Sequence, residues 1–575
     1  MKSRKKFYII LVALIALFLG IKFFGAGNDA DIVMGKVNMV QAAGWNTVLA
    51  DNVNRNVITL NIDGNTVDPG QRNIYMDENM NVMINESVLK GLLSCAVNRD
   101  GDSVILEKGS NRIKFTAGSE YYNVNGEDKS IPGKAAIIGT NLYVPVIAAG
   151  EGLSYEFSWD SPTYTASLTN KKPDEKIYPY RYDYRENNKI LKVRNQGDLG
   201  TCWAFAALTA LESSIYPEYD GNFSVDHMTY HNGYNLNQTD GGEYNMAIAY
   251  LASWNGPVYE KDDPYGDGES PDGLDPVCHV QEMQIIESKN FDGIKKSIFL
   301  YGGVQSSLYM TISDADGNSS SAYNADKNAY CYIGPEKANH DIVIIGWDDS
   351  YPAENFSTVP EGDGAFICIN SWGEDFGDNG YFYVSYFDSN IGVHNLVYTG
   401  VEPADNYDKI YQTDICGRTG QLGYGRGYAY FANAYTPEED EMLRAVGFYA
   451  TGADTEYKVY FVDDFEDKDS LRRKTLVAEG SVANAGYYTV KIDSDRFMKA
   501  GKKCAVIVYS NTPNSVHPIA IEYCADSATS TVRIDDGEGY ISLEGTYWEH
   551  VEDTQHCNIC LKMYTDVAGK QEGNK

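Results

Sequence analysis

Positive charge is scarce in this chain. Its 575 residues include 47 Lys and Arg against 81 Asp and Glu, a formal net charge of -34. Because such a charge repels phosphate backbones, the composition argues against nucleic-acid binding. Cysteine is also sparse: ten residues in so long a chain are too few for a disulfide scaffold. The pattern leaves open which of the ten pair.

Motifs that hold metals or cofactors are missing. The sequence "CNIC" at Cys557 and Cys560 has no second pair at zinc spacing, so core or disulfide cysteines are the favoured interpretation. The acidic loop "VDDFEDKDS" at 462–470 lacks the spacing of a calcium-binding loop and is interpreted as solvated. We therefore expect no metal and no cofactor.

A long apolar run occurs once, at the N-terminus. Basic residues are followed by an apolar segment from Phe7 to Leu19, which is the pattern of an export signal. With residues 21–24 the segment reaches the length of a bilayer crossing if Lys22 extends to the interface. Residues 1–27 are predicted to be a signal peptide or a retained membrane anchor. The rest of the chain is then secreted or held at the cell surface.

The remainder is globular in composition, with 43% apolar and 13% aromatic residues, and long enough for several domains. Residues 45–170 alternate short β-rich runs with Gly, Asn and Asp turns, and a strand-then-helix pattern repeats at an offset of 60 residues, from Met80 and from Thr140. A charged linker at 170–176 separates this module from a mixed α and β region at 178–400.

Cys202 is the first candidate for chemistry. It follows a turn containing Gly197 and Gly200 and opens "CWAFAALTALES", whose apolar spacing predicts a buried helix. A cysteine is commonly a small buried hydrophobe. In the first turn of a helix, however, the unpaired N–H groups and the helix dipole favour a thiolate. The pattern therefore indicates a nucleophile.

The partners that such a nucleophile needs lie further along the chain. His340 heads the apolar β-run of "NHDIVIIGWDD", where it can accept the thiol proton. Asn370 ends the β-run of "FICINSWGEDFG" and can orient the imidazole, with Trp372 shielding their hydrogen bond from water. Gln196 lies six residues before Cys202, placed to donate to an oxyanion.

Residues 407–566 return to strands, with turn signals every ten to twenty residues. This rhythm predicts an antiparallel sandwich or jelly roll. Tyr487, Tyr547 and Trp548 are candidates for stacking on sugars, although aromatic residues facing the sandwich core are commoner.

Three regions resemble known families. The blocks "NQGDLGTCWAF", "NHDIVIIGWDD" and "INSWGEDFGDNGYFYVSY" resemble the signature blocks of papain-like cysteine peptidases, in the same order. "LYVPVIAAGEGLSYEFSWD" resembles the copper amine oxidase N-terminal-like module, a non-catalytic attachment or interaction unit. "LRAVGFYA", "AGYYTVKI" and "GYISLEGTYWEH" resemble the lectin-like domain of bacterial papain-like peptidases.

The resemblance implies roles for residues and a fold class. Cys202 is the nucleophile, His340 the general acid and base, Asn370 the orienting residue and Gln196 the oxyanion donor. The substrate-binding residues are Gly241, Gly242, Trp372 and Asp341. The expected fold is α+β and multidomain: a two-lobed peptidase, with a helical lobe and a β-barrel-like lobe, between a small β-rich module and a β-sandwich.

Two departures from the family pattern are visible. Leu199 and Thr239 occupy the two positions of one usual disulfide, so both halves of that bond are absent together. Thr201 precedes the nucleophile, where the family has a smaller residue. Packing must then hold the active-site loop.

The predicted function is an exported or surface-associated cysteine endopeptidase acting on protein or peptide substrates. The C-terminal domain is a candidate for binding cell-wall polysaccharide or surface glycan, and the N-terminal segment for membrane anchoring. Two alternatives remain: an inactive surface binding protein on the same scaffold, and a cysteine amidase or transferase that acts on non-peptide amides.

Overall fold

The computed structural model describes residues 58–569, except 68, 71, 78, 132, 174, 188–190, 217–220 and 313–319. These residues form two compact units divided near Pro173. The predicted signal or anchor, residues 1–27, lies outside the described residues. Within the described ranges no helix is both long and apolar enough to cross a membrane.

The first unit is the β-rich module. Its strands form two four-stranded sheets, ordered β12-β13-β1-β2 and β10-β11-β4-β3, and a five-stranded meander from β5 to β9. The strand-then-helix repeat expected from the sequence is present as β4 with α3 and β11 with α4. The elements are β1 (Thr59–Ile62), β2 (Asn65–Val67), β3 (Ile74–Met76), β4 (Val82–Asn85), α3 (Glu86–Leu93), β5 (Ala96–Asp100), β6 (Ser103–Lys108), β7 (Asn111–Thr116), β8 (Tyr121–Val124), β9 (Glu127–Ser130), β10 (Ala136–Ile138), β11 (Asn141–Pro145), α4 (Val146–Gly152), β12 (Tyr155–Asp160) and β13 (Thr165–Asn170).

The second unit begins with a part that has a helical region and a sheet region. Its elements are β14 (Arg181–Asp183), α5 (Cys202–Ile215), α6 (Val225–Tyr230), α7 (Tyr244–Ala252), β15 (Cys278–Ile285), α8 (Phe291–Leu300), β16 (Val304–Leu308), β17 (Tyr323–Asn324), β18 (Ala329–Tyr330), β19 (His340–Asp348), β20 (Ala365–Ile369), β21 (Tyr381–Ser385) and β22 (Asn395–Pro403). Short 3₁₀ turns lie at Tyr184–Asn187 and Ala353–Asn355.

The C-terminal part of this unit is almost entirely strands. They are β23 (Lys409–Tyr411), β24 (Gly420–Leu422), β25 (Tyr428–Tyr435), β26 (Glu441–Ala450), β27 (Thr455–Val462), β28 (Thr475–Val482), β29 (Ala485–Lys491), β30 (Phe497–Met498), β31 (Cys504–Asn511), β32 (Ile519–Glu522), β33 (Gly539–Ser542), β34 (Glu549–His550), β35 (Asn558–Ile559) and β36 (Leu561–Val567), with α9 (Val551–Gln555) and a 3₁₀ turn at Lys468–Arg473.

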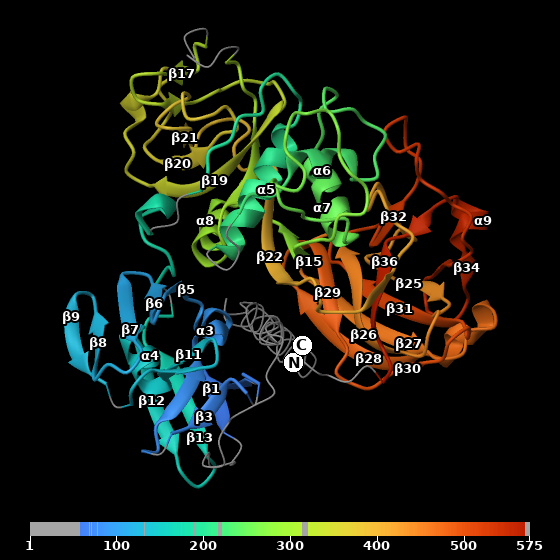
Figure 1. Ribbon diagram of the computed structural model, residues 1–575, viewed down its shortest axis with the longest axis horizontal. Helices are drawn as coiled ribbons and strands as arrows, with labels where there is room; N and C mark the ends of the chain where they lie inside the picture. Colours follow the sequence, from blue (N-terminus) through green and yellow to red (C-terminus); the bar gives the residue numbers. More distant parts are fainter. Residues whose placement is uncertain are drawn as a thin grey trace, which may run out of the picture. The chain divides into compact units, whose positions relative to one another are not determined.

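A 14-stranded sheet runs through both parts of the second unit. Strand β19 lies between β16 and β20, and β15 of the first part pairs with β29 of the second in antiparallel register, from Glu282 opposite Tyr488 to Ile285 opposite Ala485. Figure 1 shows β22, β15 and β29 side by side. The sandwich core lies between this sheet and a six-stranded sheet, β28-β27-β31-β25-β33-β34.

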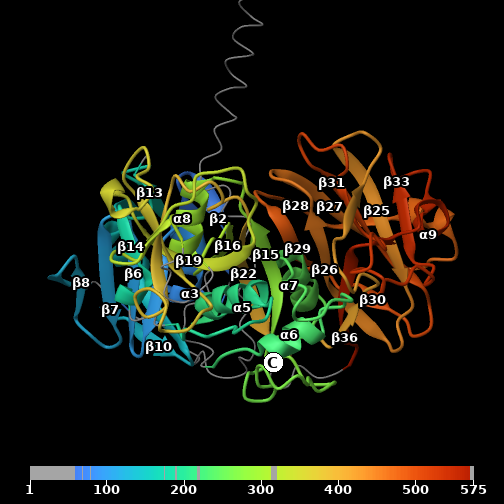
Figure 2. The same cartoon turned by 90° about the horizontal axis from the view of Figure 1, so that it is seen from above.

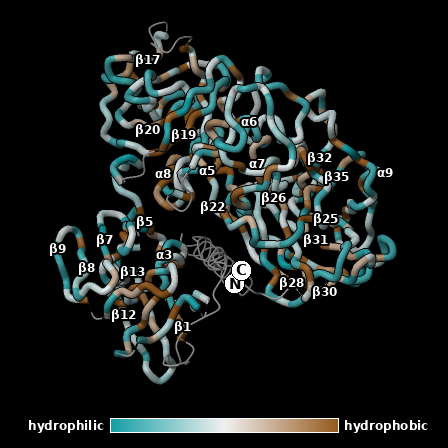
Figure 3. The backbone as a smooth tube through the Cα atoms, in the orientation of Figure 1, coloured by the Kyte–Doolittle hydropathy of each residue, from teal (hydrophilic) through white to brown (hydrophobic). Residues whose placement is uncertain are grey.

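Helix α5 lies at the centre of the first part. Its sequence, CWAFAALTALESSI, is rich in Ala and Leu, contains no Gly or Pro, and is buried on almost every side. It packs against β19, β22 and α7, and Figure 2 shows α5 and α7 next to β22 and β15. Strand β19 is apolar on both faces, as expected of a central strand. In Figure 3 the backbone along β19 and β20 has the brown colour of hydrophobic residues. The predicted fold class is confirmed.

Candidate active site

Cys202 is the first residue of α5, where the sequence places it, and its side chain is half-buried. The backbone N–H groups of Cys202, Trp203 and Asp341 lie near the sulfur and act to lower the pKa of the thiol. Asp341 follows His340 directly, so the sulfur lies beside the start of β19. The helix N-terminus and the head of β19, which are far apart in the sequence, therefore meet here.

His340 begins β19 and is 7% exposed. Its Nε2 lies 2.8 Å from Oδ1 of Asn370, the residue that follows β20. The Trp372 ring lies 4.9 Å from the imidazole, centroid to centroid, and covers this pair. Because Nε2 is engaged by Asn370, Nδ1 is the ring nitrogen that remains for another partner.

The electrostatics differ from the sequence expectation. Burial, with Asp341 as the second cause, raises the pKa of the Cys202 thiol to about 11, so the three backbone N–H groups and the helix dipole do not prevail. Burial also lowers the pKa of His340 to about 4, against the opposing effect of the hydrogen bond that its ring donates to Asn370. Both shifts favour the neutral forms, a thiol at Cys202 and an imidazole at His340. A proton passing from one to the other would create both charges at once, and their attraction would offset the desolvation.

Gln196 is held next to this pair. The backbone N–H of Gln196 donates to the Ser371 carbonyl at 2.8 Å, and the Ser371 hydroxyl donates to Oε1 of Gln196 at 2.7 Å. Nε2 of Gln196 donates to the Leu199 carbonyl at 2.7 Å. An amide nitrogen carries two N–H groups, so this bond uses one of them. The "NQG" and "NSWG" blocks are thus joined, and Asn195 forms a bridge to Trp372.

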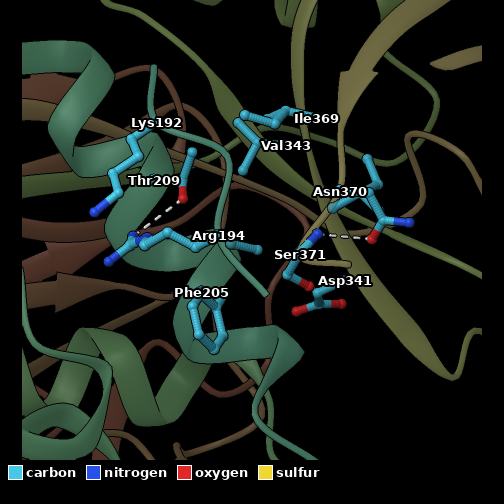
Figure 4. A pocket seen from close by; sticks show the side chains of 11 residues that line it. Lys192, Arg194, Phe205, Thr209, Asp341, Val343, Ile369, Asn370 and Ser371 are labelled. Carbon is cyan, nitrogen blue, oxygen red and sulfur yellow. Dashed lines mark hydrogen bonds between the residues drawn. The ribbon is translucent and has the colours of Figure 1, made fainter. Parts of the chain in front are cut away.

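A small pocket lies behind the site, between α5 and the ends of β19 and β20. Figure 4 shows Phe205 and Thr209 on one side of it and Asn370 and Ser371 on the other, with the Arg194 side chain lying between them and bonded to Thr209. Arg194 is buried and donates to Thr209 Oγ1 at 3.2 Å, to the Phe223 carbonyl at 2.8 Å and to the Glu212 carboxylate. These bonds fix the backbone just before Gln196.

The glycine pair lies on the other side of Cys202, just before α7. A Cβ on Gly242 would come within 2.4 Å of Nε1 of Trp203, the residue after the nucleophile, so only glycine fits there. Gly241 has a φ of 80°, in the left-handed region that glycine adopts without strain. The structure therefore brings Gly241 and Gly242 to the N-terminus of α5.

Asp341 is engaged within the protein. Its two carboxylate oxygens accept from Ser307 Oγ at 2.7 Å and from Gln305 Nε2 at 2.9 Å, and burial raises the pKa of the carboxyl group. This carboxylate therefore lies against β16 and the α5 N-terminus. Whether it also contacts substrate stays a prediction.

The supporting roles of two residues, Tyr265 and Ser371, were missed from the sequence. The Tyr265 hydroxyl lies 2.7 Å from Oγ1 of Thr201 and donates to the Gln196 carbonyl at 2.8 Å, and Ser371 bonds Gln196 as described above. Thr201 is fully buried and its hydroxyl is satisfied, so the extra methyl group before the nucleophile is accommodated. A tyrosine so far along the chain from Cys202 carries no local signal of this role.

In the described part of the chain no group of three or more His, Cys, Asp or Glu side chains is arranged to hold an ion. Cys557 and Cys560 are both buried in the C-terminal part. This agrees with the interpretation of "CNIC" as core cysteines.

Comparison with known families assigns each region. Residues 61–168 match the copper amine oxidase N-terminal domain, residues 178–401 the papain family cysteine protease, and residues 410–565 the lectin like domain. The three families occur in the order predicted from the sequence.

Individual relatives agree with this assignment. A viral cathepsin of Epiphyas postvittana nucleopolyhedrovirus is 28% identical over 226 residues, which are 38% of this chain and 62% of the relative, so the chain spans about three fifths of that protein. Pro-cathepsin H of Mus musculus is 25% identical over 240 residues, 40% of this chain and 68% of that protein.

Two solved structures match the second unit more fully. One is a variant of the clostridial cysteine protease Cwp84 after propeptide cleavage, with a TM-score of 0.59 and 25% identity over 68% of this chain and 99% of that one. The other contains the cysteine protease and lectin-like domains of Cwp84, a surface layer associated protein of Clostridium difficile, with a TM-score of 0.58 and 25% identity over 68% of this chain and 89% of that one. Residues 178–401 therefore match the papain family of cysteine proteases, with a match to the copper amine oxidase N-terminal domain before them and to the lectin-like domain after them.

Proposed function

We propose that this chain is a cysteine endopeptidase in which Cys202 attacks peptide bonds. One observation carries the proposal: the Cys202 thiol, at the start of α5, lies near the backbone N–H of Asp341, the residue after His340, while His340 is hydrogen-bonded to Asn370 beneath Trp372. The residues proposed as nucleophile, proton acceptor and orienting group come from three separate elements, which supports the proposal.

The proposed reaction has two halves. The Cys202 thiol gives its proton to His340 as the sulfur adds to the carbonyl carbon, and Gln196 donates to the developing oxyanion. The C–N bond then breaks, and the amine leaves with the proton from His340. In the second half a water molecule gives a proton to His340, attacks the thioester and releases the carboxylic acid and the thiol.

The test compares wild type with Cys202→Ala and with Cys368→Ala on denatured casein, with products identified by mass spectrometry. Cys202→Ala is expected to lose at least about a thousandfold in rate, and Cys368→Ala to keep activity. Internal fragments indicate endopeptidase action. If wild type cleaves no peptide bond, the inactive-scaffold alternative or the amidase alternative replaces this proposal, and hydrolysis of small non-peptide amides distinguishes the two.

We also propose a location at the cell surface. Support comes from the signal-like N-terminal sequence and from Cwp84, which is a surface layer associated protein. Expression of the full chain in a bacterial host, followed by fractionation and N-terminal sequencing, tests this. Recovery on the outer surface, with either a new N-terminus or an intact anchor, is expected. Recovery in the cytoplasm alone contradicts it.

A second candidate function is carbohydrate binding by the lectin-like domain. One face of the six-stranded sheet carries Tyr430 on β25 directly opposite Tyr509 on β31, with ring centroids 4.8 Å apart. Tyr428 and Tyr460 extend this row, with centroids 6.3 Å from Tyr509 and Tyr430 respectively. Tyr rings present a negative face to the C–H groups of a sugar ring.

Polar groups surround these rings. Lys458 is the cross-strand neighbour of Tyr509, Asn511 is the neighbour of Tyr428, and Tyr428 donates to Glu544 at 3.2 Å. Such groups suit sugar hydroxyls. Of the three residues singled out from the sequence, Tyr487 and Trp548 are buried and unsuited to stacking, whereas Tyr547 is 82% exposed.

Binding of cell-wall polysaccharide by affinity electrophoresis tests this second function. Tyr509→Ala and Tyr430→Ala are expected to weaken retention by about tenfold, since each removes one stacking ring. Tyr180→Ala, which removes an 86% exposed tyrosine of the peptidase domain, is the matched control. Equal retention of all forms overturns the proposal.

A further inference from the structure

The lectin-like domain contacts the loop that carries the glycine pair. This loop, residues 232–242 and here called the glycine loop, connects α6 to α7. In Figure 1 it lies where the green helices α6 and α7 approach the red segment around β32. Two segments of the lectin-like domain reach it: residues 415–416, before β24, and residues 527–531, after β32. We call these the brace segments.

The contacts concentrate on three consecutive residues of the glycine loop. The Gly233 carbonyl accepts from both the Thr531 hydroxyl and the Cys416 thiol, the latter at 3.3 Å. The Tyr234 hydroxyl donates to the Cys416 carbonyl at 2.9 Å. The Asn235 backbone N–H donates to the Ala528 carbonyl at 2.7 Å. Both lone pairs of one carbonyl and a backbone N–H are thus satisfied by another domain.

The fit at Gly233 is also steric. Its φ is 86°, and a Cβ there would come within 2.8 Å of the Ile415 carbonyl oxygen. The Asn235 side chain adds a bond from Nδ2 to Ser530 Oγ at 3.0 Å. The two backbones pack closely and are joined by several directional hydrogen bonds. This contact therefore restricts movement of the glycine loop relative to the brace segments.

The other end of the glycine loop is tied to the active site. The Gln238 carbonyl accepts from the backbone N–H of Gly200, two residues before Cys202, at 2.8 Å. Gly242 lies against Trp203, as described above. The segment that joins residues 233–235 to Gly241 and Gly242 is short and is held by the bond from Gly200. A shift of the loop at residues 233–235 should therefore also shift the glycine pair.

The sequence shows why such support is needed. The disulfide that usually ties this loop to the segment before the nucleophile is absent, with Leu199 and Thr239 in its two places. The pairing of β15 with β29 joins the lectin-like domain to the peptidase sheet. The brace segments are therefore held in place relative to the peptidase domain. We propose that Thr531, Ser530 and Cys416 are positioning residues, through which the lectin-like domain holds the glycine loop in the conformation that binds the substrate backbone.

This inference rests on the proposed peptidase function, and its test separates the two. The double variant Thr531→Val with Ser530→Ala removes two hydroxyl contacts to the loop in the full chain. We expect KM for a peptide substrate to rise about threefold to tenfold with kcat nearly unchanged, because binding common to ground and transition states is lost. Alkylation of Cys202 by iodoacetamide, which needs no glycine pair, should keep its wild-type rate.

The matched control is Thr554→Val, because the Thr554 hydroxyl also donates to a backbone carbonyl, that of His550, within the lectin-like domain. Thr531→Ser together with wild-type Ser530 should restore the wild-type KM. A KM equal to wild type in the double variant overturns the inference. So does a joint fall of kcat, alkylation rate and melting temperature, which would indicate general structural damage.

Hydrogen exchange supplies a readout that does not depend on turnover. Amides of residues 232–242 should exchange faster in the double variant and not in Thr554→Val. If wild type cleaves no peptide, the proposed function fails, and exchange still decides whether the brace segments order the loop. Unchanged exchange in the double variant overturns the brace.

Discussion

Cys202 and Cys368 are two thiols of one domain, both next to β19, in different surroundings. Cys202 opens α5, is half-buried and lies near the backbone N–H of Asp341. Cys368 lies in β20, opposite Ile344, and is fully buried, and its pKa is raised well above the ordinary value. Because burial raises both pKa values, a low thiol pKa is not what separates them. On the proposed function, the difference lies in access and in the proton acceptor proposed for Cys202, His340.

The largest effect is expected from a substitution that makes the Cys202 thiol as unreactive as that of Cys368. In His340→Gln the thiol loses its proton acceptor while its pKa stays raised to about 11 by burial. Alkylation of Cys202 by iodoacetamide at pH 7 should then slow by about a thousandfold. Peptide mapping by mass spectrometry measures this, with the exposed Cys524 as an internal reference whose labelling should not change. An unchanged rate at Cys202 would show that access alone separates the two thiols.

A smaller effect separates reactivity from turnover. Gln196→Ala removes the proposed oxyanion donor and leaves His340 and Asn370 in place, so kcat should fall by about a hundredfold while alkylation of Cys202 stays near the wild-type rate. Because Gln196 Oε1 also accepts from Ser371, Ser371→Ala serves as the control for lost packing. A parallel fall of both rates in Gln196→Ala would assign the residue a structural role instead.

The smallest effect is on stability. The pKa of His340 is lowered from 6.5 to about 4, so the unfolded chain binds a proton between these pH values that the folded protein excludes. The stability contributed by the neutral imidazole is complete above pH 6.5 and is lost as pH falls to 4. In that window the unfolding free energy of His340→Gln should fall less steeply than that of wild type, by up to about 1.4 kcal/mol per pH unit.

Urea unfolding at several pH values measures this slope, with the exposed His517→Gln as the control. Parallel curves for wild type and His340→Gln would mean that His340 is already charged in the folded protein. That outcome would replace the neutral resting pair by a thiolate and imidazolium pair, and the comparison of Cys202 with Cys368 would then become one of charge.

Local patterns were enough to place the principal candidates on their elements. The apolar spacing after Cys202 predicted the helix that it opens, and the β-runs predicted His340 at the head of one strand and Asn370 at the end of another. These are properties of contiguous segments, where side-chain periodicity reports which face is buried. The roles of Tyr265 and Ser371 could not be predicted, because each depends on a hydrogen bond to a residue more than 60 positions away.

The thiol pKa shows the same limit. A helix N-terminus predicts a lowered value, and the two local N–H groups, those of Cys202 and Trp203, do act in that direction, as does the N–H of Asp341 on β19. Desolvation and the Asp341 carboxylate are set by packing against β19, and they are larger. The sequence of the helix alone therefore cannot predict whether the pKa of the thiol is lowered or raised.

The amino-acid sequence by itself determined the order of the three families, the elements that carry Cys202, His340 and Asn370, and the absence of one usual disulfide. Only the tertiary structure decided which backbone groups lie near the sulfur and which hydrogen bonds hold Gln196. It also decided that the lectin-like domain contacts the loop that lacks the usual disulfide. The physical reason is that periodicity and turn chemistry act over neighbouring residues, whereas burial and hydrogen bonding depend on segments that only folding brings within a few ångströms.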